Sequence, residues 1–247
     1  MCGICGSLAL DEDAVVFRST TERMCAAIGH RGPDDRGLYH APGIALAAAR
    51  LSIIDVEGGR QPVRNESGTV WAVHNGEIYN YRQLREELLA SGHRLTSRGD
   101  SEVIVHLYEE HGAGFAARLR GMFSIALWDE PASQLLLVRD RLGIKPLFYG
   151  VDGGILHFGS EIKALLAAGF PRRLDPEALH DYLTFASARG RRAVLGTAAV
   201  GAAWLVFLAL GGWAWLKGQA AAEALPWIGA LGFLLGAVVV GVIYHQF

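Results

Sequence analysis

The sequence predicts an α+β domain over the first three quarters of the chain, followed by an apolar helical hairpin. Short apolar segments bounded by Gly, Pro, Asp and Asn alternate with amphipathic segments in the first part. Of the 23 Lys and Arg and 25 Asp and Glu residues, only Arg191, Arg192, Lys217 and Glu223 lie after residue 190. The apolar content of 51% excludes a wholly disordered chain. The formal net charge of −2 gives no reason to expect a nucleic-acid partner.

Six apolar segments have the length and the boundaries of buried β-strands. They are ICGSLAL (4–10), GIALAAARLSII (43–54), TVWAVHNGEI (69–78), MFSIALWD (122–129), QLLLVRD (134–140) and ILHFGS (155–160). Four further segments are predicted helices: residues 15–28, 81–91, 101–111 and 175–185. Leu84, Leu88 and Leu89 form an apolar stripe in the second of these. Asp175 and Pro176 provide an N-cap and a first-turn proline for the last.

The tail contains two uncharged runs, residues 193–216 and 226–244, and each is close to the about 20 residues that span a bilayer. Aromatic residues stand at the ends of these runs, and arginines precede the first run, as is typical of membrane helices entered from the cytoplasm. These residues are Trp213, Trp215, Trp227, Tyr244, Arg189, Arg191 and Arg192. We therefore expect residues 193–244 to anchor a cytoplasmic domain in the membrane. The alternative is a buried helix pair in a soluble protein, although such helices usually carry a polar stripe.

Cysteine usage points to a reducing compartment, because the three cysteines form an odd and sparse set. Cys2 is the candidate nucleophile. Removal of Met1 would make it the first residue, and its own α-amino group, which titrates near neutrality, would serve as the general base. Cys5 and Cys25 are expected to be small buried side chains. A Met-Cys start by itself is most often an accident, so the assignment depends on the rest of the sequence.

Several motifs strengthen that assignment. In chain order they are MCGICG (1–6), HRGPDD (30–35), ARLSIID (49–55), GGRQPV (58–63), HNGEIYNY (74–81), RGDSEVI (98–104), GMFSIALWD (121–129), RDRLGIKPLFY (139–149) and GSEIKALL (159–166). With them the chain closely resembles, over residues 2–185, the N-terminal glutaminase domain of glutamine-hydrolysing asparagine synthetases. These enzymes are class II (N-terminal nucleophile) glutamine amidotransferases.

The resemblance implies the fold of the N-terminal-nucleophile hydrolases, a four-layer αββα sandwich in which two antiparallel sheets pack face to face with helices outside. It also implies a division of the chain into a glutaminase domain (1–188) and an apolar tail (189–247). His30 and Arg31 lie in a motif, but no step of the family's reaction requires them, so we interpret them as structural. The histidines show no metal-ligand spacing, and HLYEEH (106–111) is interpreted as an ordinary helix face. No metal site is therefore expected.

The resemblance assigns the reaction to matching residues. Cys2 attacks the side-chain amide of L-glutamine, a thioester forms as ammonia leaves, and water then releases glutamate. The side-chain NH₂ of Asn75 and the backbone N–H of Gly76 stabilise the oxyanion of the tetrahedral intermediates. Taken alone, the Asn-Gly pair would more often be a turn.

The resemblance also assigns substrate binding. Arg50 is expected to bind the α-carboxylate of glutamine as a planar fork, and Glu77 and Asp100 to accept its α-ammonium. Backbone groups of Leu51, Ser52, Ile53 and Ile54 are expected to face the same ligand. Taken alone, Arg50 would more often be a surface arginine and Asp100 a helix N-cap.

The sequence contains no S-G-G-x-D-S pyrophosphate loop. We therefore expect no cofactor in this chain, and ATP and Mg²⁺ only where a separate synthetase domain is present. Three interpretations follow. The chain is a membrane-tethered glutaminase that passes ammonia to a separate synthetase subunit, or a truncated or rearranged asparagine synthetase, or a non-catalytic membrane-tethered glutamine-binding module. Cys2 favours the first two, because a pure binding site needs no nucleophile.

Overall fold

The structure, a computed structural model, describes residues 2–172 and 174–185. The chain divides into two compact units, residues 1–172 and 173–247. The predicted domain boundary at residue 188 and the predicted membrane helices at 193–216 and 226–244 lie outside the described residues.

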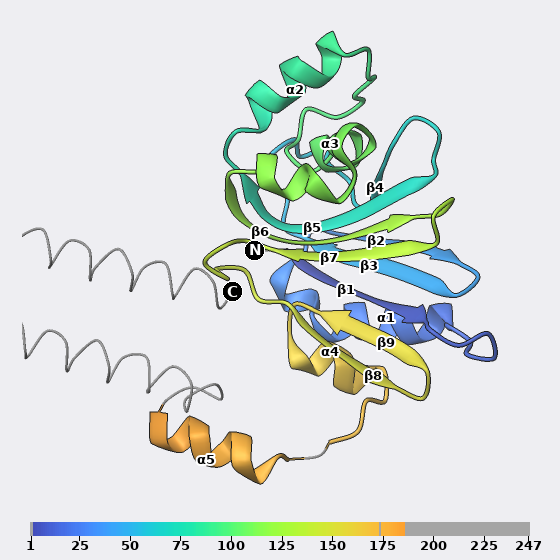
Figure 1. The fold of residues 1–247 in the computed structure, drawn as a ribbon, viewed down its shortest axis with the longest axis vertical. Helices are drawn as coiled ribbons and strands as arrows, with labels where there is room; N and C mark the ends of the chain where they lie inside the picture. Colours follow the sequence, from blue (N-terminus) through green and yellow to red (C-terminus); the bar gives the residue numbers. More distant parts are fainter. Residues whose placement is uncertain (1, 173, 186–247) are drawn as a thin grey trace, which may run out of the picture. The chain divides into compact units, whose positions relative to one another are not determined.

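The first unit is built on two antiparallel sheets that face one another (Figure 1). The five-stranded sheet has the order β2-β3-β1-β9-β8, with strands Asp35–Ala41, Ile44–Arg50, Gly3–Ala9, Ile155–Gly159 and Phe148–Asp152. The four-stranded sheet has the order β4-β5-β6-β7, with strands Val63–Arg64, Val70–Ile78, Gly121–Asp129 and Gln134–Arg139. β1 lies at the centre of its sheet, between β3 and β9.

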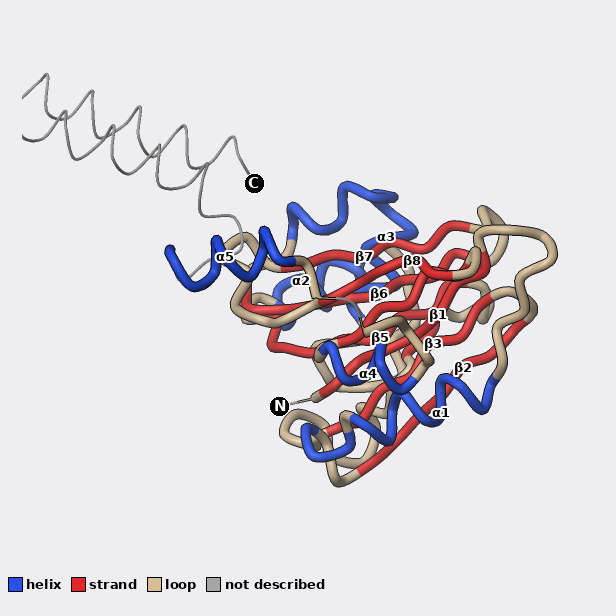
Figure 2. The backbone as a smooth tube through the Cα atoms, turned by 90° about the horizontal axis from the view of Figure 1, so that it is seen from below, coloured by secondary structure: helices blue, strands red, loops and turns tan. Residues whose placement is uncertain are grey.

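Helices cover both outer faces, so that the strands form the two inner layers (Figure 2). Helices α1 and α4 pack on the five-stranded sheet, and α2 and α3 pack on the four-stranded sheet. Their bounds are Arg18–Ala27, Ile162–Ala167, Tyr81–Ala90 and Val103–His111, with short 3-10 turns at Gly29–Arg31 and Gly112–Arg118. The predicted α+β sandwich of two antiparallel sheets is confirmed.

Alternation along the strands explains how one sheet contributes to two apolar layers. In β1, Ile4 packs between the sheets beside Phe158 and Leu46, whereas its neighbour Cys5 packs beneath α1 against Met24. Both faces of the sheet are therefore covered. This accounts for the continuous apolar run of β3, every residue of which is buried, including Arg50 at its end.

The sequence did not predict β2, β4, β8 or α4. Strand β8 contains two exposed aromatic residues, Phe148 and Tyr149, because it forms an edge of its sheet. Strand β2 is the other edge strand and is only half-buried, so it lacks the apolar run of the central strands. The predicted helix 15–28 begins later, at Arg18, because Phe17 is extended and exposed.

The second unit is described only around helix α5, Pro176–Phe185. The Oδ1 atom of Asp175 accepts hydrogen bonds from the N–H groups of Glu177 (2.9 Å) and Ala178 (3.3 Å), which confirms the predicted N-cap. Within the described parts of both units, no helix has the length and apolarity that a membrane crossing requires.

Candidate active site

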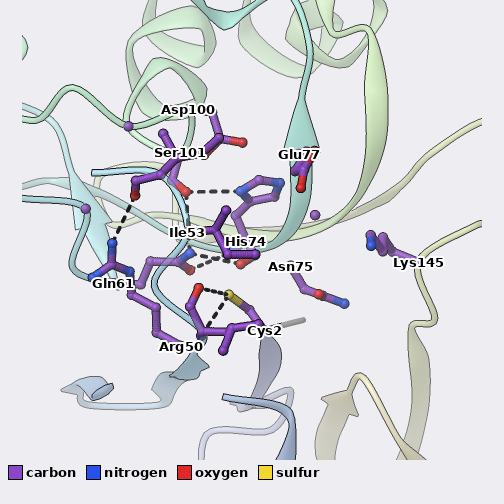
Figure 3. Close-up of a pocket in the computed structure, with 15 residues that line it drawn as sticks. Cys2, Arg50, Ile53, Gln61, His74, Asn75, Glu77, Asp100, Ser101 and Lys145 are labelled. Atoms are coloured by element: carbon purple, nitrogen blue, oxygen red, sulfur yellow. Dashed lines mark hydrogen bonds between the residues drawn. The ribbon is translucent and has the colours of Figure 1, made fainter. Parts of the chain in front are cut away.

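A pocket opens at the end of the sandwich where Cys2 precedes β1 (Figure 3). Figure 3 places Cys2 and Arg50 together at one end and Asp100 and Ser101 at the other. Every residue that the sequence assigned to the site lines this pocket except Ser52. Its lining comprises Cys2, Arg50, Leu51, Ile53, Ile54, Gly59, Gln61, His74, Asn75, Gly76, Glu77, Gly99, Asp100, Ser101 and Lys145.

The thiol of Cys2 lies against the backbone of Leu51. The N–H of Leu51 points at Sγ over 3.4 Å, and the carbonyl oxygen of Leu51 lies 3.6 Å from Sγ. The carbonyl can accept a hydrogen bond from a thiol, and the N–H can donate one to a thiolate. The arrangement therefore holds the sulfur in place in both protonation states.

Arg31 fixes the backbone of the same residue. Its Nε donates to the carbonyl oxygen of Cys2 (3.0 Å), and its Nη1 donates to a carboxylate oxygen of Glu161 (3.0 Å). Burial alone would raise the pKa of Glu161, but hydrogen bonds from Lys163, Arg31 and His30 outweigh it and lower the pKa to about 2. The structural role predicted for Arg31 therefore takes a specific form, since this side chain positions the candidate nucleophile.

Asn75 and Gly76 lie inside strand β5, so the Asn-Gly pair is not the turn that it would most often be. Asn75 is fully buried, and its side-chain NH₂ makes only a long contact, 3.5 Å, with the hydroxyl of Ser124. Gly76 has φ of +152°, and a Cβ atom at this position would lie 2.0 Å from the carbonyl oxygen of Met122. Only glycine fits, because β6 approaches so closely.

Arg50 is buried, not a surface residue. Its guanidinium donates to the carbonyl oxygens of Ile54 (3.1 Å), Asp55 (2.6 Å) and Val56 (3.0 Å). These bonds hold the loop that follows β3 against the pocket. Binding of a substrate carboxylate by Arg50 stays a prediction. In the structure the guanidinium holds the loop after β3.

The one predicted residue outside the lining, Ser52, belongs to the same loop. Its N–H donates to a carboxylate oxygen of Asp34 (2.8 Å). That backbone donor is therefore engaged within the protein. Leu51, Ile53 and Ile54 remain as the predicted residues of the loop that line the pocket.

Asp100 is not the N-cap of α3, which begins at Val103 without a side-chain cap. Its Oδ2 instead accepts the N–H of Ile78 at the end of β5 (2.9 Å). The loop that bears Asp100 is folded by Glu102, whose carboxylate accepts N–H groups and hydroxyls from Thr96 and Ser97 at 2.6–2.9 Å.

Glu102 is ionised in this role. Burial alone would raise its pKa, but hydrogen bonds from His106, Ser97 and Thr96 lower it to about 2. Asp55 joins this loop to the loop that follows β3, because it accepts N–H groups from Arg98 (2.7 Å) and Gly58 (3.1 Å). The two loops that border the pocket are thus fixed by carboxylates on backbone N–H groups.

A hydrogen-bonded group of three polar residues in the pocket lining was not predicted from the sequence. The N–H of His74 donates to Gln61 Oε1 (2.7 Å), Gln61 Nε2 donates to the His74 carbonyl (3.0 Å), and His74 Nδ1 lies 3.0 Å from the Ser101 hydroxyl. Burial lowers the pKa of the His74 imidazole, against the opposing charges of Asp100 and Glu77. The imidazole is therefore neutral near pH 7.

Lys145 was missed as well, and it is buried at the pocket wall. The carboxylate of Asp140 holds its backbone through the N–H of Lys145 (3.0 Å), while Arg139 Nε donates to its carbonyl oxygen (2.7 Å). Motif membership was the available signal for the missed lining residues. Gly59, Gln61, His74, Gly99, Ser101 and Lys145 all lie in the motifs that carry the family resemblance.

A family model described as "Glutamine amidotransferase domain" matches residues 1–199. The chain belongs to the glutamine amidotransferase family. Solved structures support the fold: a glutamine phosphoribosylpyrophosphate amidotransferase from B. subtilis in complex with ADP and GMP superimposes with a TM-score of 0.58 at 20% identity. That match covers 71% of this chain and 46% of the other.

The similar amidotransferases include named asparagine synthetases. The chain is 44% identical over 185 residues to asparagine synthetase [glutamine-hydrolyzing] 2 of Bacillus subtilis (strain 168), covering 73% of this chain and 24% of that protein. It is 42% identical over 167 residues to asparagine synthetase B [glutamine-hydrolyzing] of Escherichia coli (strain K12), covering 67% and 30%. The chain thus spans less than a third of the length of these two relatives.

We expect the contribution of Glu161 to stability to disappear in acid. A carboxylate whose pKa is lower in the folded state stabilises the protein above its unfolded pKa, and this stability is lost as the pH falls through the folded value. The wild type should therefore exceed Glu161→Gln in free energy of unfolding above about pH 4.5, and the difference should shrink toward pH 2. Urea unfolding at pH 7, 4 and 3 measures it.

The matched control is Glu12→Gln, which removes an exposed carboxylate. Its effect on the free energy of unfolding should be small at each pH. A difference between wild type and Glu161→Gln that stays constant from pH 7 to pH 3 would contradict the ion-pair assignment.

Proposed function

We propose that this amidotransferase domain hydrolyses L-glutamine to glutamate and ammonia, with Cys2 as the nucleophile. The observation that carries the proposal is the shared pocket of Cys2, Asn75 and Gly76, in which the Leu51 N–H lies 3.4 Å from Sγ. A binding site for glutamine alone would not need a held thiol.

In the proposed reaction, the α-amino group of Cys2 takes the thiol proton, and the thiolate attacks the amide carbon of the glutamine side chain. The negative charge that develops on the amide oxygen is stabilised by the NH₂ group of Asn75 and the N–H of Gly76. The carbon–nitrogen bond breaks as the terminal amine returns its proton to the leaving ammonia. Water then cleaves the thioester, which releases glutamate and restores the thiol.

Charged side chains in the pocket support glutamine as the substrate. Free glutamine carries an α-ammonium, and the carboxylates of Glu77 and Asp100 both line the pocket. Arg50 is the proposed partner of the α-carboxylate, and the loop that it holds would contribute backbone groups of Leu51, Ile53 and Ile54. Recognition of both charged groups would exclude simple amides.

The fate of the ammonia is proposed from the named relatives, which are glutamine-hydrolysing asparagine synthetases. By analogy, a separate synthetase subunit would accept ammonia from this domain. ATP and Mg²⁺ would bind to that subunit. The domain would then act on the cytoplasmic side, where Cys2 stays reduced.

For the tail, we propose a membrane hairpin. Its support is the sequence: two uncharged runs, residues 193–216 and 226–244, with aromatic ends and with arginines before the first run. Many small Gly and Ala residues would let the two helices pack closely.

The glutaminase proposal predicts a large effect of two substitutions on glutamate release by the full-length protein. Asn75→Ala should lower turnover by about 10²–10³, the usual cost of one oxyanion donor. Cys2→Ala should abolish turnover. Enzyme-coupled detection of glutamate measures both, with circular dichroism to confirm folding.

Two control variants match these changes. Cys25→Ala removes a buried cysteine outside the pocket, and Asn80→Ala removes an asparagine outside it. Both should retain turnover close to that of the wild type. Equal glutamate release by wild type and Cys2→Ala would exclude Cys2 as the nucleophile.

The active protein is predicted to begin at Cys2. If Met1 were retained, the nitrogen of Cys2 would be an amide, which cannot act as a base. Intact-mass spectrometry of the active protein should show a mass lower by one methionine. Full activity in a preparation that still carries Met1 would refute the proposed base.

The full chain is predicted to remain with membranes when these are washed at alkaline pH. This treatment removes peripheral proteins but leaves apolar membrane-spanning helices in place. Chain with Lys residues introduced at the centres of both runs should be released, since a charged group at the bilayer centre is costly. Recovery of the unmodified chain in the supernatant would exclude the hairpin.

A further inference from the structure

A cluster of two histidines and two glutamates lies outside the glutaminase pocket. Glu66 follows β4, His93 follows α2, and His106 and Glu109 lie on α3, so three separate segments meet beside that helix (Figure 1). None of the four residues lines the pocket. We propose that this cluster binds a divalent transition-metal ion, with Zn²⁺ the ion that its nitrogen and oxygen donors favour. The histidines show no ligand spacing along the sequence because the four residues come from three segments.

The distances between the histidine Nδ1 atoms and the carboxylate oxygens are close to those between neighbouring ligands of a tetrahedral ion. His106 Nδ1 lies 3.3 Å from Glu66 Oε2 and 3.2 Å from Glu109 Oε2. His93 Nδ1 lies 3.6 Å from Glu66 Oε1 and 3.7 Å from Glu109 Oε2. Bonds of about 2.0–2.1 Å to a tetrahedral ion separate neighbouring ligand atoms by about 3.3–3.4 Å. One ligand atom from each residue lies within 4.8 Å of all the others.

Each imidazole has a carboxylate near its second ring nitrogen, Nε2. His93 Nε2 lies 3.0 Å from Glu110 Oε1, and His106 Nε2 lies 3.9 Å from Glu102 Oε1. Both rings therefore present Nδ1 to the cluster. For His93, Nε2 contacts a carboxylate, the arrangement that orients a metal-bound histidine and makes its ligating nitrogen more basic. Nε2 of the buried His106 has no hydrogen-bond partner among the described residues.

The two carboxylates are also oriented. Glu66 Oε1 accepts the N–H of Arg94 (2.7 Å), and Glu109 Oε1 accepts the NH₂ of Asn65 (2.7 Å). The other oxygen of each carboxylate, Oε2, is the one that lies nearest His106 Nδ1. The protein therefore holds one oxygen of each glutamate while the second faces His106. The held oxygen of Glu66 also lies 3.6 Å from His93 Nδ1.

Burial and charge favour a cation at this position. His106 is fully buried, whereas the side chains of Glu109 and Glu66 are 29% and 35% exposed, so the glutamates offer a path from solvent. Two neutral imidazoles and two carboxylates compensate the charge of a divalent ion. The competing occupant is a proton on His106 Nδ1, which the carboxylates of Glu66 and Glu109 would share at 3.3 and 3.2 Å.

With four protein ligands, the proposed site is structural and not catalytic. The ion would join the segment after β4, the segment after α2 and helix α3. Binding to the folded state alone would then stabilise the domain. This consequence is independent of glutamine hydrolysis and can be measured without it.

The test uses untagged full-length protein carrying Cys2→Ala, which removes a thiol that would itself bind Zn²⁺. After treatment with a chelator, the protein is titrated with Zn²⁺ by calorimetry and with Co²⁺ by visible absorption. We expect one equivalent of each ion, the intense d–d bands of tetrahedral Co²⁺ without a thiolate charge-transfer band, and a rise in Tm with Zn²⁺.

Two variants in the same background remove ligands: His93→Gln and Glu109→Gln. Each should lose more affinity than Glu110→Gln, for which about a 10–100-fold loss is expected, the usual cost of removing the partner of a ligating histidine. His111→Gln is the matched control, since it removes an exposed histidine from the same helix and should leave affinity unchanged. Replacement of the fully buried His106 risks unfolding and is not needed.

Binding of less than one equivalent of Zn²⁺ and Co²⁺ by the Cys2→Ala protein would overturn the proposal and leave a proton as the occupant. Equal affinity in His93→Gln and His111→Gln would overturn it too, because the ion would then lie elsewhere. An octahedral Co²⁺ spectrum would exclude the tetrahedral four-ligand site.

Discussion

The contact between the Cys2 thiol and the backbone of Leu51 is the interaction on which the rest of the site depends. The first residues of a chain usually fray, and a nucleophile there would have no fixed position. Here β1 pairs with a strand on each side, and Arg31 holds the Cys2 carbonyl oxygen. Strand β1, which follows Cys2 directly, is therefore held on both sides, and this restricts the motion of Cys2.

Charged side chains hold the two loops around the pocket. Arg50 holds three carbonyl oxygens of one loop, and Glu102 holds the backbone of the other. Such charge-assisted hydrogen bonds are stronger than neutral ones and fix backbone geometry. The charged groups are consequently satisfied by the protein before any ligand binds.

Glu102 lies between the proposed glutamine site and the histidine and glutamate cluster beside α3. One side of its carboxylate holds Ser97 in the loop that bears Asp100, and the other side faces His106 of the histidine and glutamate cluster. The same carboxylate thus borders both sites, and it is the Ser97 and Thr96 bonds that fix its position.

The sequence predicted those parts of the molecule that are recorded in local patterns. Six strands could be identified because their residues are buried on at least one face, and helix α2 because its leucines recur on one side. Strands β2 and β8 could not, since both are edge strands of the five-stranded sheet and none of their residues is fully buried. Burial of Arg50 was equally hidden, because its partners are carbonyl oxygens, which any sequence provides.

In the candidate site too, the sequence predicted some features and left others hidden. Cys2, Asn75 and Asp100 were assigned by motif and do line one pocket, but the motifs said nothing of what holds them. The residues that hold them, among them Arg31 and Glu102, act through backbone atoms of other segments, and such contacts exist only once the sheets have packed. Ligand sets assembled from three segments, as in the cluster beside α3, are hidden for the same physical reason: their spacing is set by the fold and not by the chain.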